Sequence, residues 1–185
     1  MKWHNLFLPI LFSFTFVTCD IFQTRDPEPP TQSTSTHEPP VSADAVLRNF
    51  RFSLIEHNVV NYVNCFADTS FRQYLFTPSN LSSAFSHWNL ESERQYFLNL
   101  GTPQVNVLPI VTLSVTDSLI ASDSANYTMN YLFYYPHNRT DVSQIVRGNM
   151  RFSLGRNTQG FWYLYRWEDY RTTTDSTWSY LKANF

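Results

Sequence analysis

The period of the hydrophobic pattern changes at Pro103. Upstream of this residue, apolar residues recur at helical spacing, whereas downstream they alternate with polar residues. Consecutive alternating segments joined by short turns predict an antiparallel sheet with one wet face. Helices followed by such a sheet are typical of an α+β fold. We therefore expect a cone-shaped roll, in which N-terminal helices pack on a strongly bent antiparallel sheet.

Four long strands are predicted after Pro103, over residues 105–115, 126–135, 146–154 and 161–170. Residues 156–160 form the hairpin loop before the last strand. Alternation assigns to single faces the residues Val105, Val107, Val111, Leu113 and Val115; Tyr127, Met129, Tyr131, Phe133 and Tyr135; and Val146, Gly148, Met150, Phe152 and Leu154.

Three helices and a short strand are predicted before Pro103. Ser42 is a plausible N-cap for a helix that buries Val46, Phe50 and Leu54. Further segments are a helix over 59–66, a strand over 71–76 and a helix over 88–100 that ends at Gly101 and Pro103. Glu91 and Glu93 fall near the start of that last helix, where the helix dipole favours acidic residues.

Residues 1–18 have the pattern of an export signal. The apolar run from Leu6 to Val17 is shorter than the about 20 residues that a membrane-spanning helix needs. The run ends at Phe16-Val17-Thr18-Cys19, which resembles a bacterial lipobox and implies that Cys19 is lipidated. An ordinary secretory signal with an incidental cysteine is the alternative.

Residues 19–42 are predicted to be a disordered tether that follows the lipidated cysteine. Pro, Ser and Thr make up 12 of the 23 residues from 20 to 42, a composition that cannot bury enough apolar surface to fold. A lipid anchor with such a tether would hold a domain off a membrane of the bacterial cell envelope. Asp20 resembles an enterobacterial inner-membrane retention signal, but other phyla sort differently, so the membrane and the leaflet stay open.

The domain predicted over 43–185 carries 11 basic and 11 acidic residues, and only one of the basic residues, Lys182, is a lysine. This balance excludes the basic footprint of a nucleic-acid binder. The glycines form no phosphate-binding motif, and His57, His87 and His137 have no metal-ligand spacing, so we expect no cofactor and no metal. Cys65 lies on an apolar helix face, which favours a buried, inert thiol.

Two short motifs carry a family resemblance. Residues 160–169 (GFWYLYRWED) and 178–182 (WSYLK) resemble the closing strand and tail of nuclear transport factor 2-like domains of bacterial envelope proteins, the SnoaL-like, cystatin-like roll. The helix that opens with residues 45–50, the helix at Tyr62 and the helix led by Trp88 are similar too. The resemblance implies a cone, but this fold hosts enzymes, binding modules and scaffolds, so it implies no single function.

Candidate site residues come from the last predicted strand and from the strand over 126–135. Unless a bulge intervenes, Arg166 and Glu168 share a face with Trp162. They form either a pocket dyad or a strand-end ion pair. With Tyr131 they are the candidate pocket or surface residues. The remaining acids fall at element ends, where solvated caps are expected: Glu56, Asp68, Asp117 and Asp169.

We predict a non-catalytic binding domain for a partner protein or a small apolar ligand. Its aromatic residues lie on both strand faces, as cross-strand ladders or as an exposed surface that docks a partner or stacks on sugars. The alternative is an isomerase or hydratase of the ketosteroid isomerase and SnoaL type, with a buried carboxylate or histidine in the cone. A cavity inside the cone favours the enzyme, whereas a cone filled by Phe, Trp and Leu side chains argues against it.

Overall fold

The computed structural model describes residues 36–80, 83–103 and 107–185. The predicted signal over 1–18, Cys19, most of the predicted tether and the first residues of the strand predicted from Val105 lie outside the described residues. Within the described ranges, no helix is long and apolar enough to cross a membrane.

Local capping explains where the main helices begin and end. The Ser42 hydroxyl accepts a hydrogen bond from the Ala45 amide at 3.1 Å, which confirms the predicted N-cap. A capping box at Asn89 starts the third helix, which ends at Gly101 as predicted, with a φ of 73°. The helices are α1 (Ala43–Glu56), α2 (Val59–Val63), η1 (Ser83–Phe85, a 3-10 turn), α3 (Leu90–Leu100) and α4 (Trp178–Asn184).

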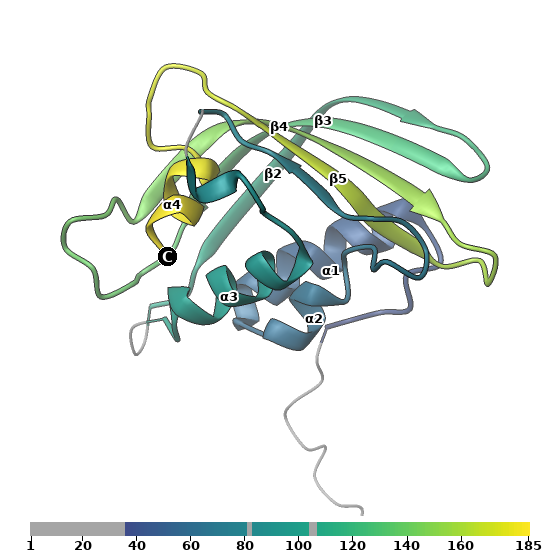
Figure 1. Cartoon of the computed structure of the whole chain (residues 1–185), viewed down its shortest axis with the longest axis horizontal. Helices are drawn as coiled ribbons and strands as arrows, with labels where there is room; N and C mark the ends of the chain where they lie inside the picture. Colours follow the sequence, from purple (N-terminus) through teal and green to yellow (C-terminus); the bar gives the residue numbers. More distant parts are fainter. Residues whose placement is uncertain (1–35, 81–82, 104–106) are drawn as a thin grey trace, which may run out of the picture. The chain divides into compact units, whose positions relative to one another are not determined.

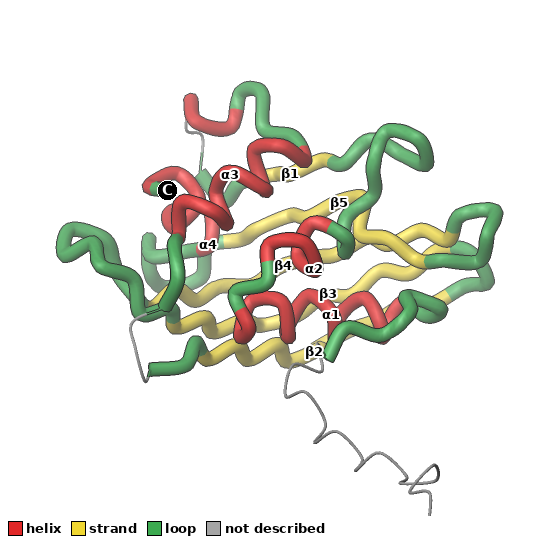
Figure 2. The backbone as a smooth tube through the Cα atoms, turned by 90° about the horizontal axis from the view of Figure 1, so that it is seen from below, coloured by secondary structure: helices red, strands yellow, loops and turns green. Residues whose placement is uncertain are grey.

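A five-stranded sheet supports the helices, and α1, α2 and α3 lie on one of its faces (Figures 1 and 2). The strand order is β1-β5-β4-β3-β2. The antiparallel pairing predicted for the four long strands is confirmed, and the short strand β1 joins β5 in parallel at one edge. In the sequence, α3 and strands β2 to β4 lie between β1 and its neighbour in the sheet, β5. The strands are β1 (Leu75–Thr77), β2 (Ile110–Ile120), β3 (Ser124–Tyr134), β4 (Ile145–Arg156) and β5 (Trp162–Tyr170).

The predicted buried faces are confirmed for β3 and β4 but not for β2. Every residue assigned to the core from Tyr127 to Tyr135 and from Val146 to Leu154 is buried. On β2, Val111 is buried, whereas Val115 is 50% exposed and the residues after it are exposed as well. β2 is an edge strand, and a bulge at Thr116 interrupts its register with β3.

The last residues of the predicted tether pack on the domain. The Glu38 amide donates to the Asn49 side chain at 2.9 Å, and the Asn49 amide group donates back to the Glu38 carbonyl at 2.8 Å. The Trp162 amide donates to the Pro40 carbonyl at 2.8 Å. Ordered contacts with the domain therefore begin before residue 43, because these segments satisfy each other's backbone groups.

Candidate functional site

A bulge in β5 decides which side chains enter the cone. Leu154 pairs with Leu164, but Ser153 pairs with Arg166, so Tyr165 is an extra residue in β5. After the bulge, the inward positions pass to Trp167 and Asp169, which are 0% and 1% exposed.

The bulge separates the predicted site residues. Tyr131 and Trp162 are buried on the inner face, whereas Arg166 is exposed and Glu168 is partly exposed. The condition for a shared face therefore fails, and the structure does not bring Arg166 and Glu168 together with Trp162 and Tyr131 in one pocket.

Aromatic side chains fill the space between the sheet and the helices. Trp178 of α4 stacks on Phe133 with ring centroids 4.7 Å apart, and it meets Trp167 edge-on at 4.9 Å. Phe50 of α1 packs against Trp167 at 5.5 Å. All of these rings are completely buried, so this part of the cone is core and not cavity.

A buried ion pair lies within this aromatic core. The Glu93 carboxylate accepts from the Tyr62 hydroxyl at 2.8 Å, from the Tyr74 hydroxyl at 2.6 Å and from the Trp88 indole at 2.7 Å. Lys182 of α4 donates to the same carboxylate, and both side chains are fully buried. The four donors compensate the carboxylate for the loss of water.

Lys182 is enclosed by rings as well as by its counter-ion. Its ammonium nitrogen lies 3.6 Å from the ring centroids of Phe76 and Trp167, which adds cation–π attraction. Burial lowers the pKa of Lys182 to about 8, and Glu93 opposes this shift. Burial raises the pKa of Tyr62 and Tyr74 well above 10, so both phenols remain hydrogen-bond donors.

A second buried carboxylate ties α4 to the sheet. Asp169 accepts from the Tyr131 hydroxyl at 2.7 Å and from the Ser179 amide at 2.7 Å. The Tyr131 oxygen in turn accepts from the Trp178 amide at 2.7 Å. Asp169 is thus a partner of the α4 N-terminus rather than the solvated cap that we expected, because the bulge turns it inward.

Sequence reasoning did not identify Glu93 and Lys182 as a buried pair, and it placed Asp169 among the solvated caps. Glu93 has the position of a dipole-stabilised surface residue near a helix start, a local pattern that gives no sign of burial. The available signal was Lys182, the one lysine in residues 43–185. A lone lysine within the closing Trp-Ser-Tyr-Leu-Lys motif could have been read as a buried counter-ion.

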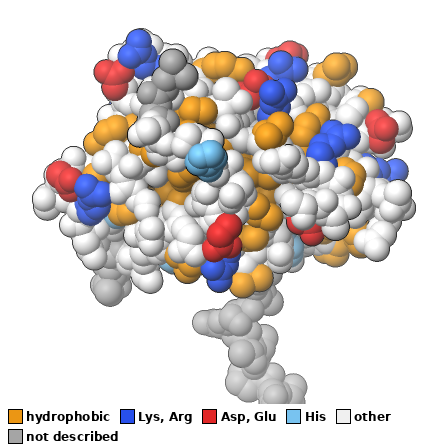
Figure 3. Space-filling view, viewed as in Figure 1, with side chains coloured by type: hydrophobic (Ala, Val, Ile, Leu, Met, Phe, Trp, Pro, Cys, Tyr) orange, Lys and Arg blue, Asp and Glu red, His pale blue; other side chains and the backbone are white. Residues whose placement is uncertain are grey.

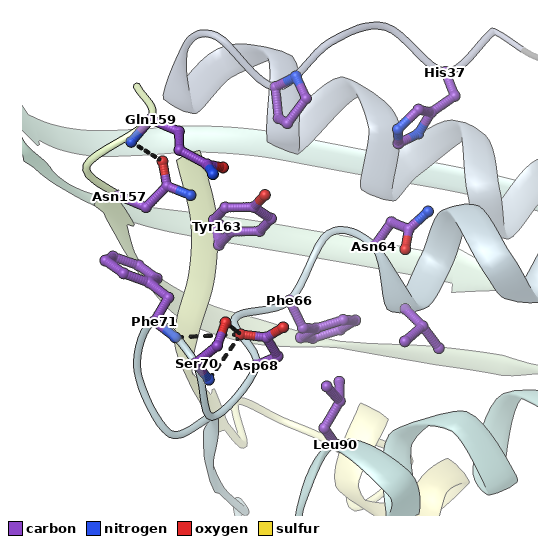
Figure 4. Close-up of a pocket in the computed structure, with 12 residues that line it drawn as sticks. His37, Asn64, Phe66, Asp68, Ser70, Phe71, Leu90, Asn157, Gln159 and Tyr163 are labelled. Carbon is purple, nitrogen blue, oxygen red and sulfur yellow. Dashed lines mark hydrogen bonds between the residues drawn. The ribbon is translucent and has the colours of Figure 1, made fainter. Parts of the chain in front are cut away.

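A cleft of about 640 Å³ lies outside this core (Figure 4). The end of α2, the loop after it, the β4–β5 hairpin and the start of the described chain surround it. Its lining residues are His37, Pro40, Val63, Asn64, Phe66, Asp68, Ser70, Phe71, Leu90, Asn157, Gln159 and Tyr163. A volume of this size lies within the range of small-molecule sites, about 300–1,000 Å³.

Two polar residues of the cleft are fixed by their own hydrogen bonds. One oxygen of Asp68 accepts from the Ser70 hydroxyl at 2.6 Å and from the Ser70 amide at 3.0 Å. These bonds lower the pKa of Asp68 and keep its carboxyl ionised. The side-chain oxygen of Asn157 accepts from the amides of Gln159 at 3.0 Å and Phe161 at 2.9 Å, so its NH₂ group is the part left to meet a ligand.

In the described ranges, the remaining candidate metal ligands and nucleophiles do not form a cluster. No three His, Cys, Asp or Glu side chains gather as metal ligands there. Burial raises the pKa of the Cys65 thiol and lowers the pKa of His57, whose ring lies beside Phe97. On the face shown in Figure 3, charged side chains lie scattered, with no large patch of one sign.

Several solved structures are similar in fold to this chain. A ketosteroid isomerase-like protein from Erwinia carotovora atroseptica matches with a TM-score of 0.50 and 10% identity, over 71% of this chain and 94% of the other. A conserved protein from Planctomyces limnophilus gives 0.52 and 11%, over 68% and 89%. An NTF-2 like protein of unknown function from Shewanella oneidensis gives 0.49 and 6%, over 69% and 95%.

This chain has the ketosteroid isomerase-like fold. The expected α+β class is confirmed, and the parallel edge strand β1 makes the open sheet a mixed one. No model of a known protein family matches the sequence, and no curated protein does so either. At identities this low the fold is shared, whereas the function must be argued from the site.

Proposed function

We propose that this chain is a lipid-anchored protein of the bacterial cell envelope whose domain, built on the ketosteroid isomerase-like fold, is a non-catalytic binding module. Cys19 would carry the anchor, and the segment after it would tether the domain. The ligand, a partner protein or a small molecule, would bind outside the cone.

The observation that carries the non-catalytic role is the packed interior. A carboxylate that abstracts a proton must reach its substrate, within about 2.6–3.2 Å of the transferred proton's donor. Glu93 is 0% exposed, and its oxygens already accept from Lys182, Tyr62, Tyr74 and Trp88. An isomerase of this fold would need that space for substrate.

The isomerase alternative has a direct test. A substrate-binding cone should be stabilised by a steroid, since a ligand that binds only the native state raises the unfolding free energy by RT ln(1 + [L]/Kd). We expect progesterone at saturating concentration to leave the thermal midpoint unchanged. A rise that disappears in a Glu93→Gln variant would support the isomerase instead.

The anchor is argued from the sequence around Cys19. The apolar run stops at the Phe16-Val17-Thr18-Cys19 motif, and a segment rich in Pro, Ser and Thr follows. An acylated cysteine with several chains gives stable membrane attachment, because each buried CH₂ contributes about 0.8 kcal/mol. Cys65, the other cysteine of the chain, is buried in the domain and is therefore not accessible to an acylating enzyme.

Replacement of the anchor residue tests this part of the proposal. A Cys19→Ala variant should move from the membrane fraction to the soluble fraction of cells, whereas the matched Cys65→Ala variant should stay with membranes. Mass spectrometry of the wild-type N-terminal peptide should show acyl chains on Cys19. Membrane retention of Cys19→Ala would refute the lipid anchor.

A further inference from the structure

The cleft between α2 and the β4–β5 hairpin has the features of a ligand site, and its role as one rests on the proposed binding function. It is separate from the packed interior around Glu93. Residues from four stretches of chain converge on it, from His37 to Tyr163. Figure 4 shows Tyr163 between the amide groups of Asn157 and Gln159 on one side and the Asp68 carboxylate on the other.

Aromatic rings form one part of the cleft wall. Phe71 and Tyr163 lie with ring centroids 6.0 Å apart and their planes tilted by 47°, and both are partly exposed. The ring of Phe71 is seated against Gly155, where a Cβ atom would lie 3.1 Å from its Cζ. The missing side chain thus leaves room for Phe71. Such rings offer flat apolar faces to a ligand.

The polar side chains of the cleft can form hydrogen bonds with the hydroxyl groups of a ligand. Asn157 presents an NH₂ donor, whereas Asn64 and Gln159 present both a donor and an acceptor. Asp68 supplies an ionised acceptor whose second oxygen is engaged by no described residue. A ligand that stacks on rings while it donates and accepts several hydrogen bonds fits this set.

The charges of the described cleft residues disfavour an anionic ligand. Among these residues there is no lysine or arginine, and the acidic side chain is Asp68. The guanidinium carbon of the nearby Arg72 lies 4.3 Å from the ring centroid of Tyr165 and 5.7 Å from that of Phe71. A phosphate or a uronic acid would meet Asp68 without a compensating cation.

We propose that this cleft binds an uncharged saccharide, whose C–H faces stack on Tyr163 and Phe71 and whose hydroxyls bond to Asp68, Asn157 and Gln159. The combination of paired rings, side-chain amides and the Asp68 carboxylate, with no lysine or arginine among the described lining residues, carries this assignment. Binding depends on hydrogen bonds and stacking rather than on long-range charge, so it should change little with salt.

Saccharide binding can be measured directly on the purified chain. The probes are cellobiose, maltose, N,N′-diacetylchitobiose and an array of neutral and acidic oligosaccharides, followed by calorimetry and saturation-transfer NMR. We expect binding to at least one neutral probe. Tyr163→Ala should weaken it by about tenfold, and Gln159→Ala, at an exposed position, should weaken it without risk to folding.

Tyr170→Ala is the matched control, because Tyr170 is an exposed tyrosine at the other end of β5. It should change affinity by less than about twofold. Equal weakening by Tyr163→Ala and Tyr170→Ala would place the site elsewhere and overturn the inference. So would stronger binding to acidic probes, binding to peptides alone, or an array without any neutral ligand.

The two proposals fail separately. If Cys19→Ala leaves the membrane but no saccharide binds, the anchored module stands and the saccharide site is wrong. If saccharides bind through Tyr163 but Cys19→Ala remains on the membrane, the site stands and the anchor is wrong.

Discussion

Removal of the lysine from the buried ion pair should destabilise the domain strongly. A Lys182→Met variant keeps an unbranched side chain that is one atom shorter, but it loses the ammonium group between Phe76 and Trp167 and with it the charge. The Glu93 carboxylate then remains fully buried, with three neutral donors and no counter-ion.

The expected loss can be set from the burial of the pair. Breaking a buried ion pair by removal of one partner costs about 3–5 kcal/mol, because an uncompensated charge remains. Both side chains are 0% exposed, so solvent screening does not reduce this figure. A typical domain has only about 5–15 kcal/mol of stability, and the loss is therefore a large part of the total.

Urea unfolding at pH 7, followed by tryptophan fluorescence, measures this loss. The double variant Glu93→Gln/Lys182→Met removes both charges, and it should recover most of the stability, since neutral replacement of a buried pair is often neutral or stabilising. The resulting double-mutant cycle should give a coupling of about 2–3 kcal/mol.

An exposed ion pair provides the control. Arg171 and Asp175 form a pair whose side chains are 62% and 86% exposed, and Arg171→Met should cost less than about 1 kcal/mol. A Lys182→Met variant within about 1 kcal/mol of wild type would show that Glu93 finds water or another partner. A double variant no more stable than the single one would show that the charges do not interact as the structure implies.

Further predictions concern packing and thiol reactivity. Gly148→Ala would place a Cβ atom 2.6 Å from the Tyr170 carbonyl and 2.7 Å from the Tyr131 hydroxyl, and it should lower the unfolding free energy by about 1–3 kcal/mol; an unchanged urea midpoint would contradict this packing. Cys65 should react with a thiol reagent at pH 8 only after denaturation, because burial raises the pKa of its thiol; rapid labelling of the native protein would contradict its burial.

Local patterns predicted much of the fold correctly. Ser42 caps α1 as expected, and the alternating residues of β3 and β4 point inward along their whole length. Both strands lie inside the sheet with a neighbour on each side, so the period of two in the sequence becomes a period of two in burial.

The predictions from hydrophobic periodicity failed where contacts between distant segments determine the burial or pairing of a strand. β5 carries aromatic residues on both faces, so its sequence does not mark the bulge at Tyr165 that turns Arg166 and Glu168 outward. β2 alternates well, but it is an edge strand and most of its residues stay exposed. The parallel contact of β1 joins segments about 90 residues apart, which no local pattern reports.

The candidate sites show the same division. Lys182 was visible as a lone lysine, but its partner Glu93 comes from a helix 89 positions earlier in the chain. The cleft likewise combines residues from His37 to Tyr163, whose types are ordinary one by one. Their chemistry depends on their meeting, which only the packing of distant segments decides.

The sequence by itself determined the order of helices and strands, the inward faces of the central strands and the features around Cys19 that suggest an anchor. These depend on local spacing and composition. The tertiary structure decided that the cone is filled, that Glu93 and Lys182 are buried together, and that a cleft lies outside the core. These depend on contacts between distant segments, because burial and charge pairing are properties of the folded chain and not of any one stretch of it.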